Sequence, residues 1–370
     1  MKKKQIISLI VVAAILGALV YLQFRSWRSF DWAKFRQYTG GVSLWHIGAG
    51  VALIYLAYVL RAIRWAIFLK PTAPTSFRRL LGPQIIGFAA LGLFGRAGEF
   101  ARPYLIARKE KLSFTSQLAV WTVERFFDLG SVVLLVAVFF AIKGGVLARI
   151  LLQAMNNGLR MAAHNASHKL PLALAALVVL ALLFFVLRRA SGRAATALRA
   201  RLYAFKQGFN TIHSVGAFIQ LVLVSVAMWL MIAGAYIEVL HAYPQIIVTV
   251  SGDPAGVQRV ARMNTMKLDD VLLVMGSSIL GSVVQLPGGV GGSQLAVIGV
   301  LQSNLFSGEP YNITRELAVS CGIMLWLVTF MSVIPAGVIW ARFEKVSFLR
   351  LSEESSQEEE AVEQNAAEAS

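Results

Sequence analysis

Six charged side chains interrupt otherwise apolar stretches of the chain. In chain order they are Arg96, Glu99, Arg102, Glu124, Arg125 and Asp128. A charged side chain at membrane depth costs roughly 2.5 to 3.5 kcal/mol on insertion scales, so none of the six is expected to face lipid. Glu124 and Asp128 are four residues apart and share one face of a helix. The six residues predict a polar site inside a membrane protein.

These residue types indicate phosphate binding. A guanidinium group grips a phosphate through two parallel hydrogen bonds, and carboxylates hold such arginines or meet an ammonium headgroup. Arg61 and Arg64, at the end of the preceding apolar segment, are further candidates for the same site. Two structural alternatives stay open. The six residues could form ion pairs that lock helices together, and Arg61 and Arg64 could extend to lipid headgroups.

A glycine-rich stretch, Pro-Gly-Gly-Val-Gly-Gly at 287–292, is a second candidate site. It lacks the Gly-Lys-Ser/Thr of a P-loop and no strand precedes it, so neither a P-loop nor a dinucleotide fingerprint is indicated. Its glycines allow a tight break and expose backbone amides to an anion, although close helix packing would also explain them. The candidate residues here are Gly288, Gly289, Gly291, Gly292 and Gln294.

Composition places the chain in a membrane. Of 370 residues, 57% are hydrophobic and only 15% are charged. Soluble domains rarely combine such a fraction with several long uncharged runs. The net charge of +16 comes from Lys and Arg at the ends of apolar segments, which favours anionic lipid over nucleic acid as the partner. Cys321 is the only cysteine, and we expect no metal site and no cofactor.

Hydrophobic runs predict the spanning helices. The expected full spans are 6–24, 44–69, 114–142, 171–187, 215–240 and 317–341. Three lysines before the first span and the basic stretch 188–206 place the N-terminus in the cytoplasm of a multi-pass plasma (inner) membrane protein. The acidic tail 351–370 has too few apolar residues to fold and is expected to be disordered and cytoplasmic.

Two apolar segments are too short for a full span. Residues 80–94 are interrupted by Gly82-Pro83, Gly87 and Gly92, and residues 272–306 by the glycine-rich stretch. Each reads as a broken, re-entrant helix pair, which membranes tolerate where the backbone lines a cavity. The segments 44–142 and 215–341 then form two inverted repeats. We expect an all-α polytopic protein with about six to nine membrane helices, forming one transmembrane domain over 1–350.

The chain resembles the family of lysylphosphatidylglycerol synthase transmembrane domains, which are flippase-like membrane proteins. The resemblance rests on three stretches: Gly-Arg-Ala-Gly-Glu-Phe-Ala-Arg-Pro at 95–103, Glu-Arg-Phe-Phe-Asp at 124–128, and Leu-Pro-Gly-Gly-Val-Gly-Gly at 286–292. It covers roughly residues 5–345. It implies an inner-membrane domain that moves phospholipid between leaflets, in some members aminoacylated phosphatidylglycerol. Full-length synthases continue into a soluble aminoacyl-transferase domain, so we expect no enzyme activity here.

We therefore expect a lipid flippase or transporter whose partner is membrane phospholipid. In this mechanism Arg96, Arg102 and Arg125 bind the lipid phosphate, while Glu99 and Glu124 are among the carboxylates that balance them. Two alternatives stay open: a membrane subunit that works with a separate soluble lipid-modifying transferase, and a non-catalytic scaffold for envelope assembly. A homo-oligomer is also compatible with the sequence.

Overall fold

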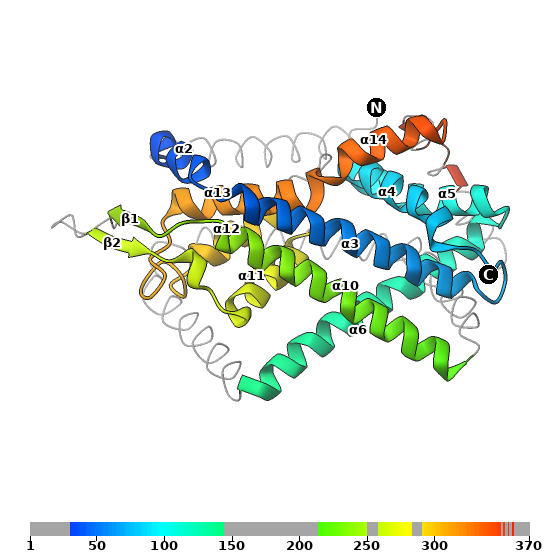
Figure 1. Cartoon of the computed structure of the whole chain (residues 1–370), viewed down its shortest axis with the longest axis horizontal. Coiled ribbons are helices and arrows are strands. Elements are labelled where there is room, and N and C mark those ends of the chain that lie inside the picture. The colour runs from blue at the N-terminus through cyan, green and yellow to red at the C-terminus, as the bar shows by residue number, and fades with distance from the viewer. Residues whose placement is uncertain are drawn as a thin grey trace, which may run out of the picture.

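The computed structural model describes residues 30–143, 214–249, 258–282 and 291–348, together with 351, 354, 357 and 358. Most of this part of the chain is helical (Figure 1). In chain order the longer elements are α2 (Trp32–Gly40), α3 (Leu44–Leu69), α4 (Phe77–Phe94), α5 (Ala101–Glu110), α6 (Phe114–Lys143), α10 (Val215–His241), α11 (Leu268–Gly281), α12 (Gly292–Leu301), α13 (Arg315–Trp326) and α14 (Val333–Phe343). The predicted helical fold class is confirmed.

Three stretches of helix among the described residues are long and apolar enough to cross a membrane. They are Leu44–Leu69, Val215–His241 and Arg315–Phe343, and they agree with the predicted spans 44–69, 215–240 and 317–341. The predicted span 114–142 is the helix α6. The predicted spans 6–24 and 171–187 lie outside the described residues.

Helices α3 and α10 run side by side in opposite directions through the middle of the molecule (Figure 1). His46 near the start of α3 pairs with Glu238 near the end of α10, at 2.7 Å between Nδ1 and Oε2. Near the other end of the pair, Arg64 donates to Ser225. Both helices are apolar along most of their length, so each can bury one face on the other and leave another face for lipid.

The first short segment forms a helical hairpin. Helix α4 leads into a 3-10 turn, η1 (Gly95–Gly98), and α5 returns beside α4. Gly95 has φ 62°, a conformation that glycine adopts without strain, and it ends α4. Gly87 faces α5 so closely that an added Cβ would lie 2.5 Å from the Cβ of Arg102. The two arms, of 18 and 10 residues, are shorter than the ~20 residues of a typical span.

The position of this break differs from the prediction. The interruptions Gly82-Pro83, Gly87 and Gly92 were expected to divide 80–94, but α4 is continuous through all of them and the chain turns at η1. These glycines instead allow close packing, since Gly87 contacts α5 and Gly92 lies beside Ile334 of α14. The cost of about 1 kcal/mol for glycine in a helix is offset by these contacts.

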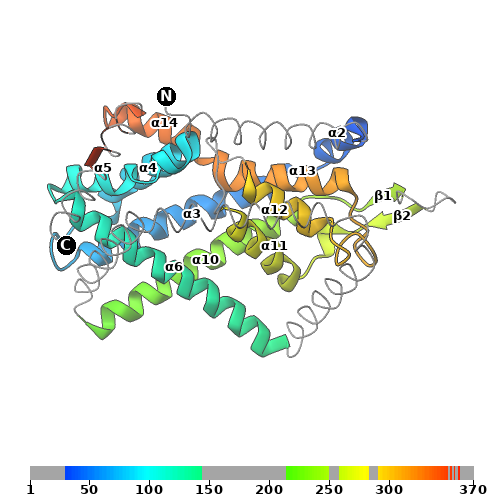
Figure 2. The same cartoon turned by 180° about the vertical axis from the view of Figure 1, so that it is seen from behind.

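The second short segment forms a similar hairpin from α11 and α12. The arms have 14 and 10 residues, and the connection at 283–290 lies outside the described residues. A Cβ on Gly281 would collide with the carbonyl group of Gly292, so the two arms touch where they leave the turn. In Figures 1 and 2 this hairpin and the α4–α5 hairpin lie toward opposite ends of the long axis.

The last long helix has a π-helical stretch, η4 (Leu327–Met331), between α13 and α14. Pro335 follows it and has no N–H to donate to the carbonyl of Met331, which accounts for the irregularity. Ser332 N bonds to Leu327 O at 2.8 Å, and the hydroxyl of Tyr55 on α3 donates to Ser332 O at 2.7 Å. A neighbouring helix therefore supplies a hydrogen bond to the backbone directly after the irregular stretch.

Three elements were not predicted, namely two strands and one helix. Strands β1 (Ile246–Thr249) and β2 (Gln258–Ala261) pair antiparallel, with Ile246 opposite Ala261, between the predicted span 215–240 and the short segment 272–306. Helix α2 occupies the basic stretch between the first two predicted spans. It begins at an Asp31 cap and packs on α13, where Thr39 Oγ1 lies 2.8 Å from Ser320 Oγ.

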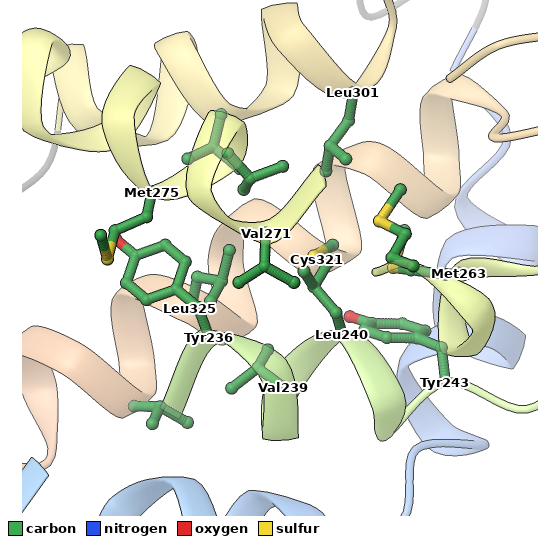
Figure 3. Packing of buried hydrophobic residues seen from close by; sticks show 14 of the residues in the cluster. Tyr236, Val239, Leu240, Tyr243, Met263, Val271, Met275, Leu301, Cys321 and Leu325 are labelled. Carbon is green, nitrogen blue, oxygen red and sulfur yellow. The ribbon is translucent and has the colours of Figure 1, made fainter. Parts of the chain in front are cut away.

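The largest hydrophobic cluster among the described residues joins α10 to the elements that follow it and extends to α2, α3 and α4. Figure 3 shows Tyr236, Val239 and Leu240 of α10 packed against Val271 of α11 and Cys321 of α13. Cys321 is buried and free, as its apolar surroundings predict. This core fixes the second hairpin against α10.

The two halves of the described chain share an order of elements: a long helix, a hairpin with short arms, and a second long helix. The first set is α3, α4–α5 and α6, and the second is α10, α11–α12 and α13–α14. The first helices of the two sets run antiparallel. That is the direction an inverted repeat requires, and the repeat itself stays a prediction.

Of the tail 351–370, only four residues are described. Leu351 is buried against α5 and α14, and Glu354 accepts a hydrogen bond from the hydroxyl of Tyr104 at 2.8 Å. The start of the tail therefore contacts the first hairpin. The predicted disorder of the remaining tail is not tested.

Candidate functional site

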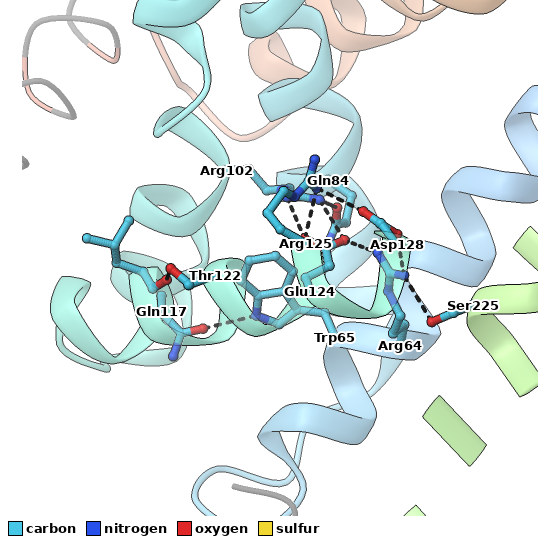
Figure 4. Close-up of polar contacts among 11 residues, drawn as sticks. Arg64, Trp65, Gln84, Arg102, Gln117, Thr122, Glu124, Arg125, Asp128 and Ser225 are labelled. Carbon is cyan, nitrogen blue, oxygen red and sulfur yellow. Dashed lines mark hydrogen bonds and ion pairs between the residues drawn. The ribbon is translucent and has the colours of Figure 1, made fainter. Parts of the chain in front are cut away.

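A buried ion-pair network joins α3, α5 and α6 (Figure 4). Its centre is Glu124, whose side chain is 1% exposed. Arg102 donates to both carboxylate oxygens of Glu124, with Nη1 at 3.1 Å and Nη2 at 2.6 Å. Arg64 forms a short ion pair with Glu124 through Nη2 and donates from Nη1 to Asp128 at 2.7 Å. The carboxylates thus bridge two buried guanidinium groups.

Local structure holds each member of this network. Glu124 and Asp128 project from one face of α6, as their spacing predicts. Arg102 is placed by the close contact of α5 with Gly87, and it also donates to Gln84 Oε1 at 3.3 Å. Its guanidinium lies 4.8 Å from the ring centroid of Trp65, a cation–π contact.

Arg125 lies at the edge of the same network and is less constrained. Its side chain is 42% exposed, and its Nη2 lies 3.4 Å from Glu124 and 3.3 Å from Asp128. These are longer contacts than those of Arg64 or Arg102, and an exposed ion pair contributes little stability. The guanidinium of Arg125 is therefore the member of the network most free to meet a ligand.

Arg61 differs from the other arginines. Its guanidinium stacks over Phe88 with 4.5 Å to the ring centroid. Its Nε is buried and lacks a hydrogen-bond partner, and no carboxylate among the described residues pairs with it. Arg61 as a whole is partly buried, and a cation in an apolar helix without a paired carboxylate is costly, so this side chain is suited to an incoming anion.

Arg61 lines a cavity of about 770 Å³ that lies between the two hairpins. The same cavity meets Glu99 beside the first hairpin, and Arg125 and Asp128 on α6. Much of the remaining wall is apolar, with contributions from α3, α4, α10 and the π-helical stretch η4. The volume falls within the roughly 300–1,000 Å³ of typical small-molecule sites.

The described charged side chains of this region carry a positive excess. Four guanidinium groups (Arg61, Arg64, Arg102 and Arg125) face three carboxylates (Glu99, Glu124 and Asp128). The formal excess is one positive charge, which favours an anionic ligand. The geometry can therefore bind one anion beside an apolar wall.

Comparison with known proteins identifies the family. The model of the lysylphosphatidylglycerol synthase TM region matches residues 5–337, which include the ion-pair network, the cavity and both hairpins. The chain belongs to this family. No curated protein and no solved structure matches the chain. Membership in the lysylphosphatidylglycerol synthase TM family, together with the apolar helices, makes this a membrane protein with a lipid-related role.

The family motif at 95–103 contributes unevenly to the site. Arg102 is in the buried network, and Glu99 lines the cavity. Arg96 lies in η1, at the turn of the first hairpin, but its side chain is outside the described part of the structure. The motif at 124–128 contributes all of its predicted site residues to the network, namely Glu124, Arg125 and Asp128.

The glycine-rich family motif is only partly described. Gly288 and Gly289 lie outside the described residues. Gly291 has φ 135°, and its N–H donates to Gln294 Oε1 at 2.8 Å, which ends the turn and starts α12. Gly292 packs against Gly281 of α11. These contacts are structural, and none of the three described candidates lines the cavity.

Sequence reasoning missed several polar residues of this region. Gln84 and Ser225 accept hydrogen bonds from the network arginines, and Ser278 and Ser293 line the cavity from the second hairpin. Single hydroxyl and amide side chains in apolar helices are common and carry no spacing signal. In the sequence, only the short length of the two apolar segments indicated that polar residues there could line a site.

Proposed function

We propose that this protein is a phospholipid flippase that binds the lipid phosphate in the cavity between the two hairpins. The observation that carries the proposal is that one cavity combines a cation with a largely apolar wall. The cation is Arg61, which has no carboxylate partner among the described residues. A phospholipid needs both features, because its phosphate requires a cation and its acyl chains require apolar surroundings.

The residues divide into two roles in this proposal. Arg61 and Arg125 contact the phosphate, since both line the cavity and neither is fully committed to carboxylates. Arg64, Arg102 and Glu124 form the buried network that fixes the hairpin and α3 against α6. This revises the expected phosphate set, in which Arg102 was a binding residue.

The two hairpins provide the route. Each has arms shorter than a bilayer, and the cavity lies between them. Alternating movement of one half against the other would expose the cavity to each leaflet in turn, as in transporters built from paired re-entrant segments. By the charge bias of the loops, we place the protein in the inner membrane with both termini in the cytoplasm.

The test is translocation in liposomes with purified protein. Acyl-labelled fluorescent phospholipids are placed in both leaflets, and a membrane-impermeant reagent quenches the outer one. With the wild-type protein, labelled lipid of the inner leaflet should become accessible to the quencher. Arg61→Gln should slow this translocation about tenfold or more, since a charged hydrogen bond contributes about 1.5 to 3 kcal/mol. Arg61→Lys keeps the charge without the planar fork and should recover part of the rate.

Arg79→Gln is the matched control. Arg79 is an exposed arginine on α4 that pairs with Glu110 at 3.2 Å, away from the cavity, and its loss should leave translocation unchanged. All variants are checked for monodisperse elution. If wild type leaves the inner leaflet protected with anionic, zwitterionic and aminoacylated lipids alike, the flippase proposal is wrong. Equal rates for wild type and Arg61→Gln would remove Arg61 from the mechanism.

A further inference from the structure

Besides the arginines, the wall of the cavity has a second set of polar groups, which are hydroxyls. They belong to Ser278 of α11, Ser282 directly after α11, Ser293 of α12, Tyr236 of α10 and Thr329 of η4, and all five residues line the cavity. Because they lie on the second hairpin and the elements packed against it, this region is built from different elements than the arginine region.

Three of these hydroxyls form a chain. The hydroxyl of Tyr236 donates to Ser278 Oγ at 2.8 Å, and Ser278 Oγ lies 2.5 Å from Ser293 Oγ. When Tyr236 donates to Ser278 and Ser278 donates to Ser293, the hydroxyl proton of Ser293 is left for a further acceptor. The hydroxyl chain therefore presents a hydrogen-bond donor at the cavity.

A second donor supports this reading. Trp229 of α10 lines the cavity, and its indole Nε1 is buried without a hydrogen-bond partner among the described residues. A buried N–H without a partner costs free energy, so a ligand acceptor here would be stabilised. Ser293 and Trp229 thus offer two neutral donors, both suited to hydroxyl or ether oxygens.

Among the residues that the structure describes, this region carries no charge that could hold an ammonium group. Residues 271–308, which include all of the second hairpin after its first turn, contain no Asp, Glu, Lys or Arg. The described carboxylates that line the cavity are Glu99, which directly follows η1, and Asp128 on α6. An ammonium group placed among the hydroxyls would be desolvated without a counter-ion, which is costly.

We infer that the substrate is a phospholipid of net negative charge whose headgroup is uncharged and bears hydroxyls. This inference rests on the proposed flippase function. The phosphate lies at Arg61 and Arg125, and the headgroup hydroxyls, such as those of glycerol or a sugar alcohol, bond to the Tyr236–Ser278–Ser293 chain. Lipids with amine or aminoacyl headgroups are poor substrates, because their ammonium group finds no carboxylate in the hydroxyl region.

The first experiment compares lipids on the wild-type protein in the liposome assay. Phosphatidylglycerol, phosphatidylethanolamine and aminoacylated phosphatidylglycerol carry the same labelled acyl chain. Phosphatidylglycerol should translocate at least about tenfold faster than either amine lipid, an energetic difference near 1.4 kcal/mol. Equal rates for the three lipids, or faster movement of an amine lipid, would overturn the headgroup assignment while leaving the flippase function standing. No movement of any lipid would instead overturn the proposed function.

The second experiment tests the hydroxyl chain through selectivity. Phosphatidic acid has the phosphate but no further headgroup, so the rate ratio of phosphatidylglycerol to phosphatidic acid reports on headgroup binding alone. Ser293→Ala should lower this ratio about fivefold, the value of one neutral hydrogen bond. Ser277→Ala is the matched control, because Ser277 bonds to its own helix at Val274 O and does not line the cavity.

The ratio separates binding from a purely structural role. If Ser293 only supports packing, both lipids slow together and the ratio in Ser293→Ala equals that of wild type, which would overturn the inference. A ratio lowered equally by Ser277→Ala would overturn it as well, because the effect would then belong to the helix and not to the hydroxyl chain.

Discussion

Replacing Glu124 by glutamine should destabilise the protein by about 3 to 5 kcal/mol, the cost of removing one partner from a buried ion pair. The carboxylate is 1% exposed and neutralises Arg64 and Arg102 together. Glutamine has nearly the same shape, so packing is preserved and the charge alone is lost. Arg102, whose side chain is 5% exposed, would then keep only neutral acceptors such as Gln84 Oε1.

A double-mutant cycle shows where this cost arises. Arg102→Met removes the other side of the pair and leaves Glu124 with Arg64 and the longer contact to Arg125. The double variant lacks both charges of the Arg102–Glu124 pair, so neither charge is left buried without the other. Its free energy of unfolding should therefore exceed the value expected from adding the two single effects, by about 1 to 3 kcal/mol.

The assay is reversible unfolding in mixed detergent micelles, followed by the fluorescence of the protein's eight tryptophans. Glu110→Gln is the matched control, since Glu110 pairs with an arginine whose side chain is 60% exposed, and it should cost no more than about 1 kcal/mol. If Glu124→Gln is within 1 kcal/mol of wild type, or if the two single effects add, the network is not what holds these helices together. Glu124 would then be available for transport chemistry.

Two further predictions concern the same helices and are measured by thermal unfolding in detergent. Gly87→Ala should destabilise the protein by about 1 to 3 kcal/mol, because the new Cβ would lie 2.8 Å from the Cα of Arg102 and α5 would have to move. Gly130 faces open space, so Gly130→Ala is the control and should not destabilise the protein. Equal effects of the two substitutions would contradict the close contact at Gly87. Ser225→Ala should cost about 1 to 3 kcal/mol by removing an acceptor 3.0 Å from Arg64 Nη1, and no change would exclude that bond.

The long helices were predictable because length and apolarity alone define them. The run 44–69 begins after Ser43 and ends before Lys70, and α3 has the same bounds. The same reasoning located Glu124 and Asp128 in the interior, since no charged residue can face lipid at low cost. Both predictions use only the cost of placing a side chain in the bilayer, and that cost can be read from one residue at a time.

Pairing and packing could not be predicted in this way. Arg64 and Asp128 are 64 residues apart, and nothing in either segment names the other as its partner. The glycines of α4 look like helix breaks in the sequence, but Gly87 lies in a helix and contacts α5. A glycine permits both a turn and a close approach, and only the three-dimensional arrangement decides between them.

The structure also changes how the arginines should be interpreted. From the sequence, Arg102 is the stronger phosphate candidate, and Arg61 is only a further one because it lies near the end of an apolar segment. In the fold, Arg102 is held by both oxygens of Glu124, so releasing it to a phosphate would leave a buried carboxylate short of a partner. Arg61 has no such bond to break, and a phosphate would remove an existing cost. A membrane site that must bind and release an anion repeatedly is better served by the second kind of arginine, with the first kind holding the helices between which the anion moves.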